Sequence, residues 1–443
     1  MRTKGTIEAF FLILVLFSFI SMVNAEESST DACLKCHMEK SPGIYMQWKN
    51  SEHGANGITC IDCHGAEKGD VDGFMHEGVL IATLVTPKDC SQCHDQEAKE
   101  VSESYHATAG QILESNDAYL AHVAGGHPAV VTGCESCHGG KVKIDPTSPN
   151  KLHAMSWPNS GIGRMNPDGS LGSCTACHTR HSFSIAQARQ PEACSKCHLG
   201  PDHPQKEIYE ESKHGNAYFT NKEKMNLDEE KWVAGVDYYA APTCATCHMS
   251  ATRGQQATHD VGKRLYWTLR PPISIRKENH DQKRANMLEV CTSCHGKQFA
   301  DGHFYQFDAL VNLYNEKFAA PATEIMNLIK KKNLLKNKAS FGNKIEWTYW
   351  ELWHHEGRRA RHGASMMAPD YTWWHGIYEV AKHFYFKFLP EAEEYGDAEV
   401  NALIEKILKD PWHDWLNKPA AELKEAIRSG KQPELYKKLF KTH

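Results

Sequence analysis

The spacing of apolar residues divides the chain into three parts. A nearly continuous apolar run extends from Ala9 to Val23. The middle of the chain, up to about residue 303, is rich in glycine and polar residues and shows few of the alternating patterns typical of strands. From Phe304 onwards, apolar residues recur at steps of three and four, which predicts helices. The predicted helices cover Ala309–Phe318, Ile325–Ile329, segments starting at Ile345 and at Tyr378, and a last amphipathic segment from Ala420 to Leu439.

The N-terminal apolar run predicts a secretory signal peptide over residues 1–25. Arg2 and Lys4 precede the run, and Val23-Asn24-Ala25 provides the small residues of a cleavage site. A retained membrane anchor is the alternative, but the run is shorter than the roughly 20 residues that span a bilayer. We therefore expect an exported, soluble protein of the periplasm or an equivalent extracytoplasmic compartment.

All 16 cysteines belong to one repeated pattern, Cys-x-x-Cys-His. The pattern is typical of covalently attached c-type haem. Exported proteins usually place cysteines in disulfides, but none is left over here. Zinc sites do not require a histidine after every second cysteine. We expect haem attachment at Cys33, Cys36, Cys60, Cys63, Cys90, Cys93, Cys134, Cys137, Cys174, Cys177, Cys194, Cys197, Cys244, Cys247, Cys291 and Cys294. The expected proximal iron ligands are His37, His64, His94, His138, His178, His198, His248 and His295.

Eight haems would be crowded in a chain of this length. Two thioether bonds hold the edge of each porphyrin, and the adjacent histidine binds the iron from below. After removal of 25 residues, 418 of the 443 remain, or roughly fifty per haem. The haems must then pack against one another and supply much of the apolar core. Such an array conducts electrons, and a net charge of −5 makes nucleic acid an improbable partner.

Histidines outside the motifs are candidates for the second axial ligand of each iron. Eight of the 27 histidines lie in motifs, which leaves 19. We favour His53, His106, His181, His214 and His259, because each lies shortly before or after a haem loop. Since the spare histidines outnumber the haems, the count does not show which haem lacks a second ligand.

These patterns predict a mainly α protein. We expect a multihaem cytochrome c fold with sparse strands over residues 26–303, followed by a bundle of long helices over residues 304–443. Helices that bind no cofactor usually pack on each other or on a neighbouring subunit, and we expect both.

Several longer motifs resemble the octahaem hydroxylamine oxidoreductase family, and the last five haem motifs also resemble the pentahaem nitrite reductases. The resemblance covers about residues 130–300 and reaches into the C-terminal third. It is carried by Trp157–Arg164 with Asn166–Ser170, Cys177–Phe183, Gln187–Pro191, Gly200–Gln205, Ser212–Gly215, Asp237–Pro242, Pro369–Thr372 and Trp374–Gly376.

The resemblance implies that the haem of the fourth motif has an open face that binds a nitrogenous substrate. It implies that the other seven haems carry electrons with two histidine ligands each, and that the chain forms a homotrimer. In the oxidising members, a tyrosine of the neighbouring subunit is cross-linked to the active haem. Tyr371 best matches that position, and Tyr378 and Tyr385 lie nearby. Reducing members lack the tyrosine and convert nitrite or nitric oxide to hydroxylamine or ammonia.

The resemblance also places Asp202, His203 and Tyr239 at the active haem. The Asp-His pair would exchange protons with the substrate, and the tyrosine hydroxyl would bond to its N–O group. A turn in which His203 ligates a haem, and a core position for Tyr239, are the alternatives. A nearby aromatic and basic cluster could form a trimer seam, an anion entrance or a source of axial ligands. Its members are Trp350, Trp353, His354, His355, Arg358, Arg359 and Arg361.

The expected function is hydroxylamine oxidation to nitric oxide or nitrite, with a soluble or membrane-associated cytochrome as redox partner. Reduction of nitrite or nitric oxide, and hydrazine oxidation, are alternatives at the same site. A pure electron carrier with eight six-coordinate haems is the alternative of a different class. A structural subunit is a weaker fourth reading, because eight haems would be superfluous in it.

Overall fold

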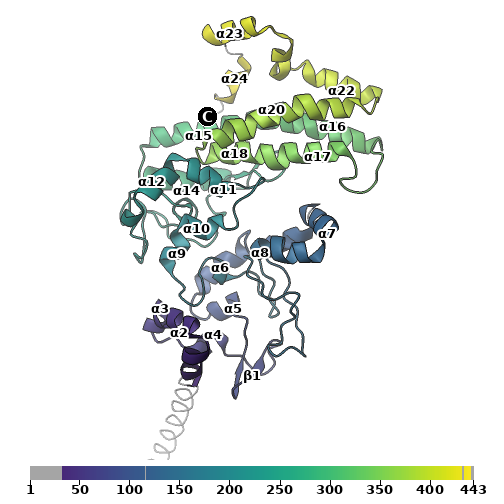
Figure 1. The fold of residues 1–443 in the computed structure, drawn as a ribbon. Coiled ribbons are helices and arrows are strands. Elements are labelled where there is room, and N and C mark those ends of the chain that lie inside the picture. The colour runs from purple at the N-terminus through teal and green to yellow at the C-terminus, as the bar shows by residue number, and fades with distance from the viewer. Residues whose placement is uncertain (1–31, 115, 432–433, 441–443) are drawn as a thin grey trace, which may run out of the picture. The chain divides into compact units, whose positions relative to one another are not determined.

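The computed structural model describes residues 32–114, 116–431 and 434–440 (Figure 1). The expected signal peptide lies outside these residues. Within them, the chain is mainly helical and its two sheets have two strands each, so the predicted fold class is confirmed. Among the described residues, no helix is both long and apolar enough to cross a bilayer.

The chain forms two compact units. The first extends to Ala188 and also takes in His259–Val261, and it carries the first five haem motifs. The second comprises Arg189–Thr258 and Gly262–His443, and it carries the other three motifs together with the helical third. The expected boundary at residues 303 and 304 falls inside a continuous helix, α15 (Lys297–Tyr314). The change there marks the end of the haem motifs rather than a break in the backbone.

The first unit consists of short helices joined by loops, with one hairpin. Strand β1 (Phe74–His76) pairs antiparallel with β2 (Val79–Ile81). Glu77 and Gly78 of the turn both have positive φ, as a tight hairpin turn prefers. The other elements are α2 (Pro42–Lys49), α3 (Glu52–Ala55), α4 (Cys60–His64), α5 (Pro87–Cys90), α6 (Asp95–Glu103), η1 (Ala109–Glu114), α7 (Asn116–Ala129), η2 (Val130–Cys134), α8 (Glu135–His138), η3 (Cys174–Ala176) and α9 (Ile185–Arg189).

The haem-bearing part of the second unit is fixed to its helices by one buried carboxylate. Asp308 of α15 is fully buried and accepts hydrogen bonds from Tyr266 and Trp267 at 2.9 and 2.7 Å. It also pairs with Arg276 and Arg284 at 3.3 and 2.8 Å. The elements here are α10 (Pro191–Ser195), α11 (Gln205–Glu211), α12 (Lys213–Thr220), η4 (Lys222–Lys224), α13 (Cys244–His248), β3 (Trp267–Thr268), β4 (Ile275–Arg276) and α14 (His280–Thr292).

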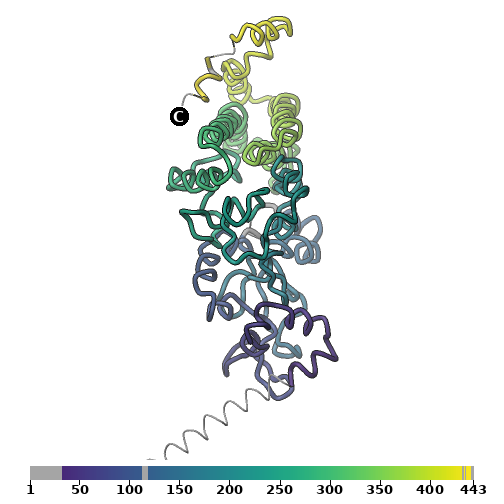
Figure 2. Tube along the Cα trace, turned by 90° about the vertical axis from the view of Figure 1, so that its left-hand side faces the viewer, coloured from purple at the N-terminus to yellow at the C-terminus, as the bar shows by residue number. Residues whose placement is uncertain are grey.

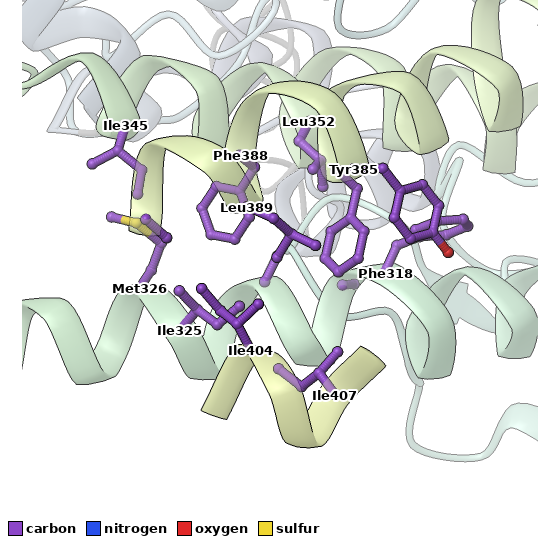
Figure 3. Packing of buried hydrophobic residues seen from close by; sticks show 14 of the residues in the cluster. Phe318, Ile325, Met326, Ile345, Leu352, Tyr385, Phe388, Leu389, Ile404 and Ile407 are labelled. Carbon is purple, nitrogen blue, oxygen red and sulfur yellow. The ribbon is translucent and has the colours of Figure 1, made fainter. Parts of the chain in front are cut away.

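The helical third has a core of its own. Buried side chains from several helices meet in it, among them Phe318, Ile325, Leu352, Phe388 and Ile404 (Figure 3). The longer helices lie alongside one another around this core (Figures 1 and 2). The helices of this part are α16 (Ala320–Lys331), α17 (Lys344–Trp350), α18 (Gly357–Ser365), α19 (Pro369–Thr372), α20 (Glu379–His383), α21 (Leu389–Glu393) and α22 (Ala398–Leu408).

Wider π-helical turns interrupt these helices. They are η5 (Asn315–Ala319), η6 (Glu351–Glu356), η7 (Trp373–Tyr378) and η8 (Phe384–Phe388). Such turns change the direction of the side chains that follow, and they often occur at functional sites. A periodicity of 3.6 residues does not reveal them.

The end of the chain differs from its prediction. The single segment expected from Ala420 to Leu439 forms two helices, α23 (Ala420–Arg428) and α24 (Glu434–Leu439). Gly430 between them has a φ of 68°, which ends the first helix. The short 3-10 turn η9 (Pro411–Asn417) precedes this pair.

Candidate functional site

Capped single-turn helices present several of the motifs. Cys60–His64 forms α4, and Cys244–His248 forms α13. Thr59 precedes α4, and its backbone N–H donates to Asp62 at 2.6 Å. Thr243 precedes α13 and closes a similar capping box. The caps fix these short helices, so the cysteines and the histidine keep a constant relative arrangement.

Motifs distant in sequence lie next to each other within each unit. In the first unit, the thiols of Cys90 and Cys174 share a hydrogen bond. In the second unit, Cys194 and Cys244 do the same. These four sulfurs belong to four different motifs and would be thioethers once haem is attached. The positions therefore suit closely spaced porphyrin edges, as an electron-conducting array requires.

Five motif histidines each face another histidine across a similar gap. Metal–imidazole bonds of about 2 Å on opposite sides of one ion place the two ring centres roughly 6 Å apart. The pairs are His37 with His76 at 6.3 Å, His64 with His181 at 6.2 Å, His94 with His53 at 6.1 Å, His178 with His259 at 6.4 Å and His295 with His214 at 6.0 Å. The residues thus fit bis-histidine haem at five motifs.

The pairs include four of the five expected axial ligands, namely His53, His181, His214 and His259. His106 is half-buried just before η1, and its ligation stays a prediction. His76, which lies on strand β1, is one of the spare histidines but not one of the five that we favour from the sequence. The sequence feature that could have pointed to His76 as a ligand is the hairpin turn that follows it. Its distance from a haem motif along the chain does not distinguish it.

A group of glycines holds the fourth motif. The backbone N–H of Gly163 donates to the carbonyl of His138 at 3.1 Å. A Cβ at Gly161 would lie 2.1 Å from the backbone nitrogen of Gly139, so only glycine allows this approach. These glycines explain part of the Trp157–Arg164 motif, because they let that segment pack closely against the backbone of His138 and Gly139.

Asp202 and His203 lie in the loop after the sixth motif and form a hydrogen-bonded pair. Oδ1 of Asp202 is 2.5 Å from Nδ1 of His203, and Nε2 of the same ring is 3.0 Å from the carbonyl oxygen of Cys197. Both ring nitrogens face acceptors, an arrangement that suits the doubly protonated, positively charged ring. Burial opposes that charge, but the hydrogen bond and the charge of Asp202 outweigh it and raise the pKa of His203.

This arrangement bears on the alternative in which His203 ligates a haem. Its ring centre is 6.2 Å from that of His198, a separation like that of the other pairs. However, a ligand must offer a free nitrogen lone pair, and here both nitrogens are used as donors. The geometry therefore favours an acid–base residue over an axial ligand.

The aromatic and basic cluster of the helical third contacts the other oxygen of Asp202. Nη1 of Arg358 lies 3.2 Å from Oδ2, and Nε2 of His354 lies 3.9 Å from it. Burial would raise the pKa of Asp202, but the hydrogen bond with His203 and the surrounding positive charges lower it to about 2. Arg358 is held in turn by the carbonyl of Arg270 at 3.1 Å. The π-helical turn η6 carries His354 to this position.

The two tyrosines have different surroundings. Tyr239 is 77% exposed, whereas its neighbour Tyr238 is buried and stacks on Trp232. The core position that we considered for Tyr239 is thus occupied by Tyr238. Tyr371 lies on α19, with its ring centre 5.6 Å from that of His375. Burial and nearby acidic groups, Glu207 first among them, raise the pKa of Tyr371.

Comparison with protein families identifies haem-binding sequence in two parts of the chain. A model described as "Seven times multi-haem cytochrome CxxCH" matches residues 163–340. A model of cytochrome c554 and c-prime matches residues 19–65. Together these matches support covalently bound haem c in this chain.

Similar whole proteins have related descriptions. The chain is 24% identical, over 462 aligned positions and 78% of its length, to a probable nitrite reductase–hydroxylamine oxidoreductase fusion protein of Kuenenia stuttgartiensis. It spans about half of that relative, 49% of its length. A shorter match, 31% identical over 86 residues, covers 18% of this chain and 17% of cytochrome c-552 of Haemophilus ducreyi.

Solved structures share the fold. A structure titled "Hypothetical multiheme protein" has a TM-score of 0.73 and 27% identity, and the match covers 85% of this chain and 96% of that one. A chain from a reducing HAO-like protein complex of Kuenenia stuttgartiensis has a TM-score of 0.62 and 22% identity, covering 87% and 88%. The motifs, the fold and these relatives together support a multihaem c-type cytochrome that is similar to the hydroxylamine-oxidoreductase-like proteins.

Proposed function

We propose that this protein is an exported octahaem oxidoreductase that oxidises hydroxylamine to nitric oxide or nitrite at the haem of the fourth motif. The observation that supports an enzyme is the Asp202–His203 pair, held by Arg358 and His354. An electron carrier needs no acid–base pair with both partners fixed. The remaining haems would take electrons from the site, with the paired histidines as their axial ligands.

The protein's contribution to the reaction is the handling of protons. Oxidation of hydroxylamine to nitric oxide releases three electrons and three protons, and oxidation to nitrite uses one water and releases four electrons and five protons. The haem supplies the redox-active iron. Asp202 and His203 would exchange protons with the substrate as an acid–base pair, and Asp202 would stabilise the positive charge of the ring. Tyr239 would add a second donor from its exposed hydroxyl.

Reduction of nitrite or nitric oxide is the second candidate, and one observation favours it. Reduction consumes protons, and the acceptors beside both ring nitrogens of His203 favour a protonated ring that can supply one. In the oxidative direction, His203 must first pass a proton on before it can accept another. The direction therefore depends on Tyr371, the candidate for the cross-link found in oxidising members.

The setting of Tyr371 supports a contact with another subunit. An exposed aromatic patch of Trp373, Trp374 and Tyr378 follows it directly, with exposures of 50, 56 and 43%. Apolar groups exposed together usually mark an interface. We propose that this patch forms part of a homotrimer seam and carries Tyr371 towards the neighbouring active haem. A small cytochrome is the proposed redox partner.

The oxidative assignment predicts a covalent link between subunits through Tyr371. Under denaturing conditions, intact-mass analysis should show chains joined through haem, and Tyr371→Phe should give monomers only with a changed haem spectrum. Tyr378→Phe is the matched control and should keep the link. Monomers alone in the unmodified protein would remove the support for oxidation and leave reduction as the function.

Carbon monoxide binding tests the open haem and the paired histidines together. The reduced protein should bind carbon monoxide at a single haem, because only one iron has a free face. His181→Gly should open a second haem, that of His64, since the two rings lie 6.2 Å apart. His280→Gly, which removes a histidine paired with Asp281 at 3.0 Å, should leave binding at one haem.

The same titration separates an enzyme from an electron carrier. An electron carrier with eight six-coordinate haems would bind no carbon monoxide and show no high-spin ferric signal. That result would reject the proposed function. Unchanged binding in the His181→Gly protein would reject the assignment of that ligand alone.

A further inference from the structure

Glu356 is a buried acid in the helical third that the chemistry above does not use. It ends the π-helical turn η6, its residue is 5% exposed, and its Oε2 atom has no hydrogen-bond partner. A buried carboxylate oxygen without a hydrogen-bond partner costs on the order of 1–3 kcal/mol. Such a group persists where it serves a purpose beyond packing or where water reaches it.

On one side, Glu356 adjoins the group that contacts Asp202. It directly follows His354 and His355, whose ring centres are 5.3 Å apart. Nε2 of His354 is 3.9 Å from Oδ2 of Asp202. The electrostatic neighbours of His355 include both Glu356 and Asp202. His354 of the turn η6 thus approaches Asp202, and Glu356 ends the same turn two positions later.

On the other side, Glu356 adjoins a path to the surface. Its Oε1 atom is 3.0 Å from Nδ1 of His383 on α20, although the ring N–H does not point along that line. Nε2 of His383 is 2.7 Å from Nζ of Lys387, which is exposed. His383 itself is only 13% exposed. A protonatable ring thus lies between a buried acid and a solvent-exposed amine.

We propose that Glu356 and His383 form a proton relay between the Asp202–His203 pair and solvent. In the reductive direction, Lys387 would give a proton to Nε2 of His383 while the ring passes its Nδ1 proton to Glu356, and water would then reprotonate Lys387. In the oxidative direction, Lys387 would first release a proton to water and then accept one from His383, which takes a proton from Glu356. The proposal rests on the proposed function, since each direction of that chemistry moves several protons for every substrate.

Other charged groups around Glu356 hold the relay in place. Arg359 lies 3.5 Å from Oε1 and is bound by Glu379 at 2.8 Å. Glu379 in turn lies 3.8 Å from His375. Tyr314 of α15 faces Glu356 from a fourth element. Arg359 orients the carboxylate through this ion pair.

The test compares two buried glutamates. Glu391 is also 5% exposed, also has a buried Oε2 atom without a hydrogen-bond partner, and pairs with Lys344 at 3.1 Å. Glu356→Gln should lower kcat on hydroxylamine by at least about 10²-fold, the low end of the 10²–10⁴-fold range of proton-transfer catalysis, and leave KM unchanged. Glu391→Gln should retain normal kcat. Redox-difference infrared spectra should show a carboxyl band that is lost only with Glu356.

A second variant guards against a folding defect. His383→Ala should slow turnover, and imidazole added to solution should restore part of the rate. Equal behaviour of the two glutamine variants, or an infrared carboxyl band that survives in Glu356→Gln, would overturn the relay. If the unmodified protein does not turn over hydroxylamine but shows the band, and Glu356→Gln loses it, the substrate assignment fails and the relay stands.

Discussion

Replacing Asp202 with asparagine is expected to lower kcat on hydroxylamine by about 10²- to 10⁴-fold, the usual range for the loss of an acid–base group. The carboxylate faces the charged ring of His203 at 2.5 Å and the guanidinium of Arg358 at 3.2 Å. Asparagine keeps the shape but removes the negative charge, so His203 loses its second proton and its orientation. Steady-state rates with hydroxylamine measure the effect, with haem content and absorption spectra recorded alongside.

The matched control for this change is Asp301→Asn. Asp301 pairs with Lys297 at 2.5 Å, and its side chain is 23% exposed against 22% for Asp202. The Asp301→Asn protein should retain normal kcat. A fall in kcat with both variants would show a general effect of lost charge. Full activity in Asp202→Asn would place the acid–base group elsewhere.

Replacing Asp308 with asparagine is expected to lower the free energy of unfolding by about 3–5 kcal/mol, the cost of breaking a buried ion pair on one side. The fully buried carboxylate accepts hydrogen bonds from Tyr266 and Trp267 and pairs with Arg276 and Arg284. In the variant, the guanidinium groups of Arg276 and Arg284 lie beside an uncharged amide instead of a carboxylate. Denaturant unfolding followed by tryptophan fluorescence measures the loss.

Asp281→Asn serves as the comparison for stability. Its side chain is 91% exposed, so the free energy of unfolding should change by no more than about 0.5 kcal/mol. A loss below about 1 kcal/mol in Asp308→Asn would mean that solvent or rearranged side chains satisfy the arginines. Activity of the surviving folded fraction separates this structural role from catalysis.

The sequence was sufficient for features set by local spacing. The positions of Cys134, Cys137 and His138 fix haem attachment whatever the surrounding fold, and the three- and four-residue steps after Phe304 predicted the helices that form. Four expected axial histidines could be chosen because they adjoin motifs. His76 could not, because its position depends on a hairpin that brings a strand back to the first motif.

The acid–base site depends on contacts that sequence spacing does not specify. Asp202 and Arg358 are 156 positions apart. The cluster that contains Arg358 was visible as a run of aromatic and basic residues, but its three suggested roles did not include contact with Asp202. The deciding element is the π-helical turn at 351–356, which turns His354 towards the carboxylate. Apolar periodicity does not contain that information.

The facing histidine rings imply an order of assembly. His64 and His181 come from segments far apart in the sequence, and their rings approach to 6.2 Å only when the first unit is folded. A porphyrin that had to enter between them afterwards would meet a closed gap. We therefore expect thioether formation to precede folding, while the chain is still extended. Folding then brings the second histidine onto each iron, so the attached haems act as the template on which the unit closes.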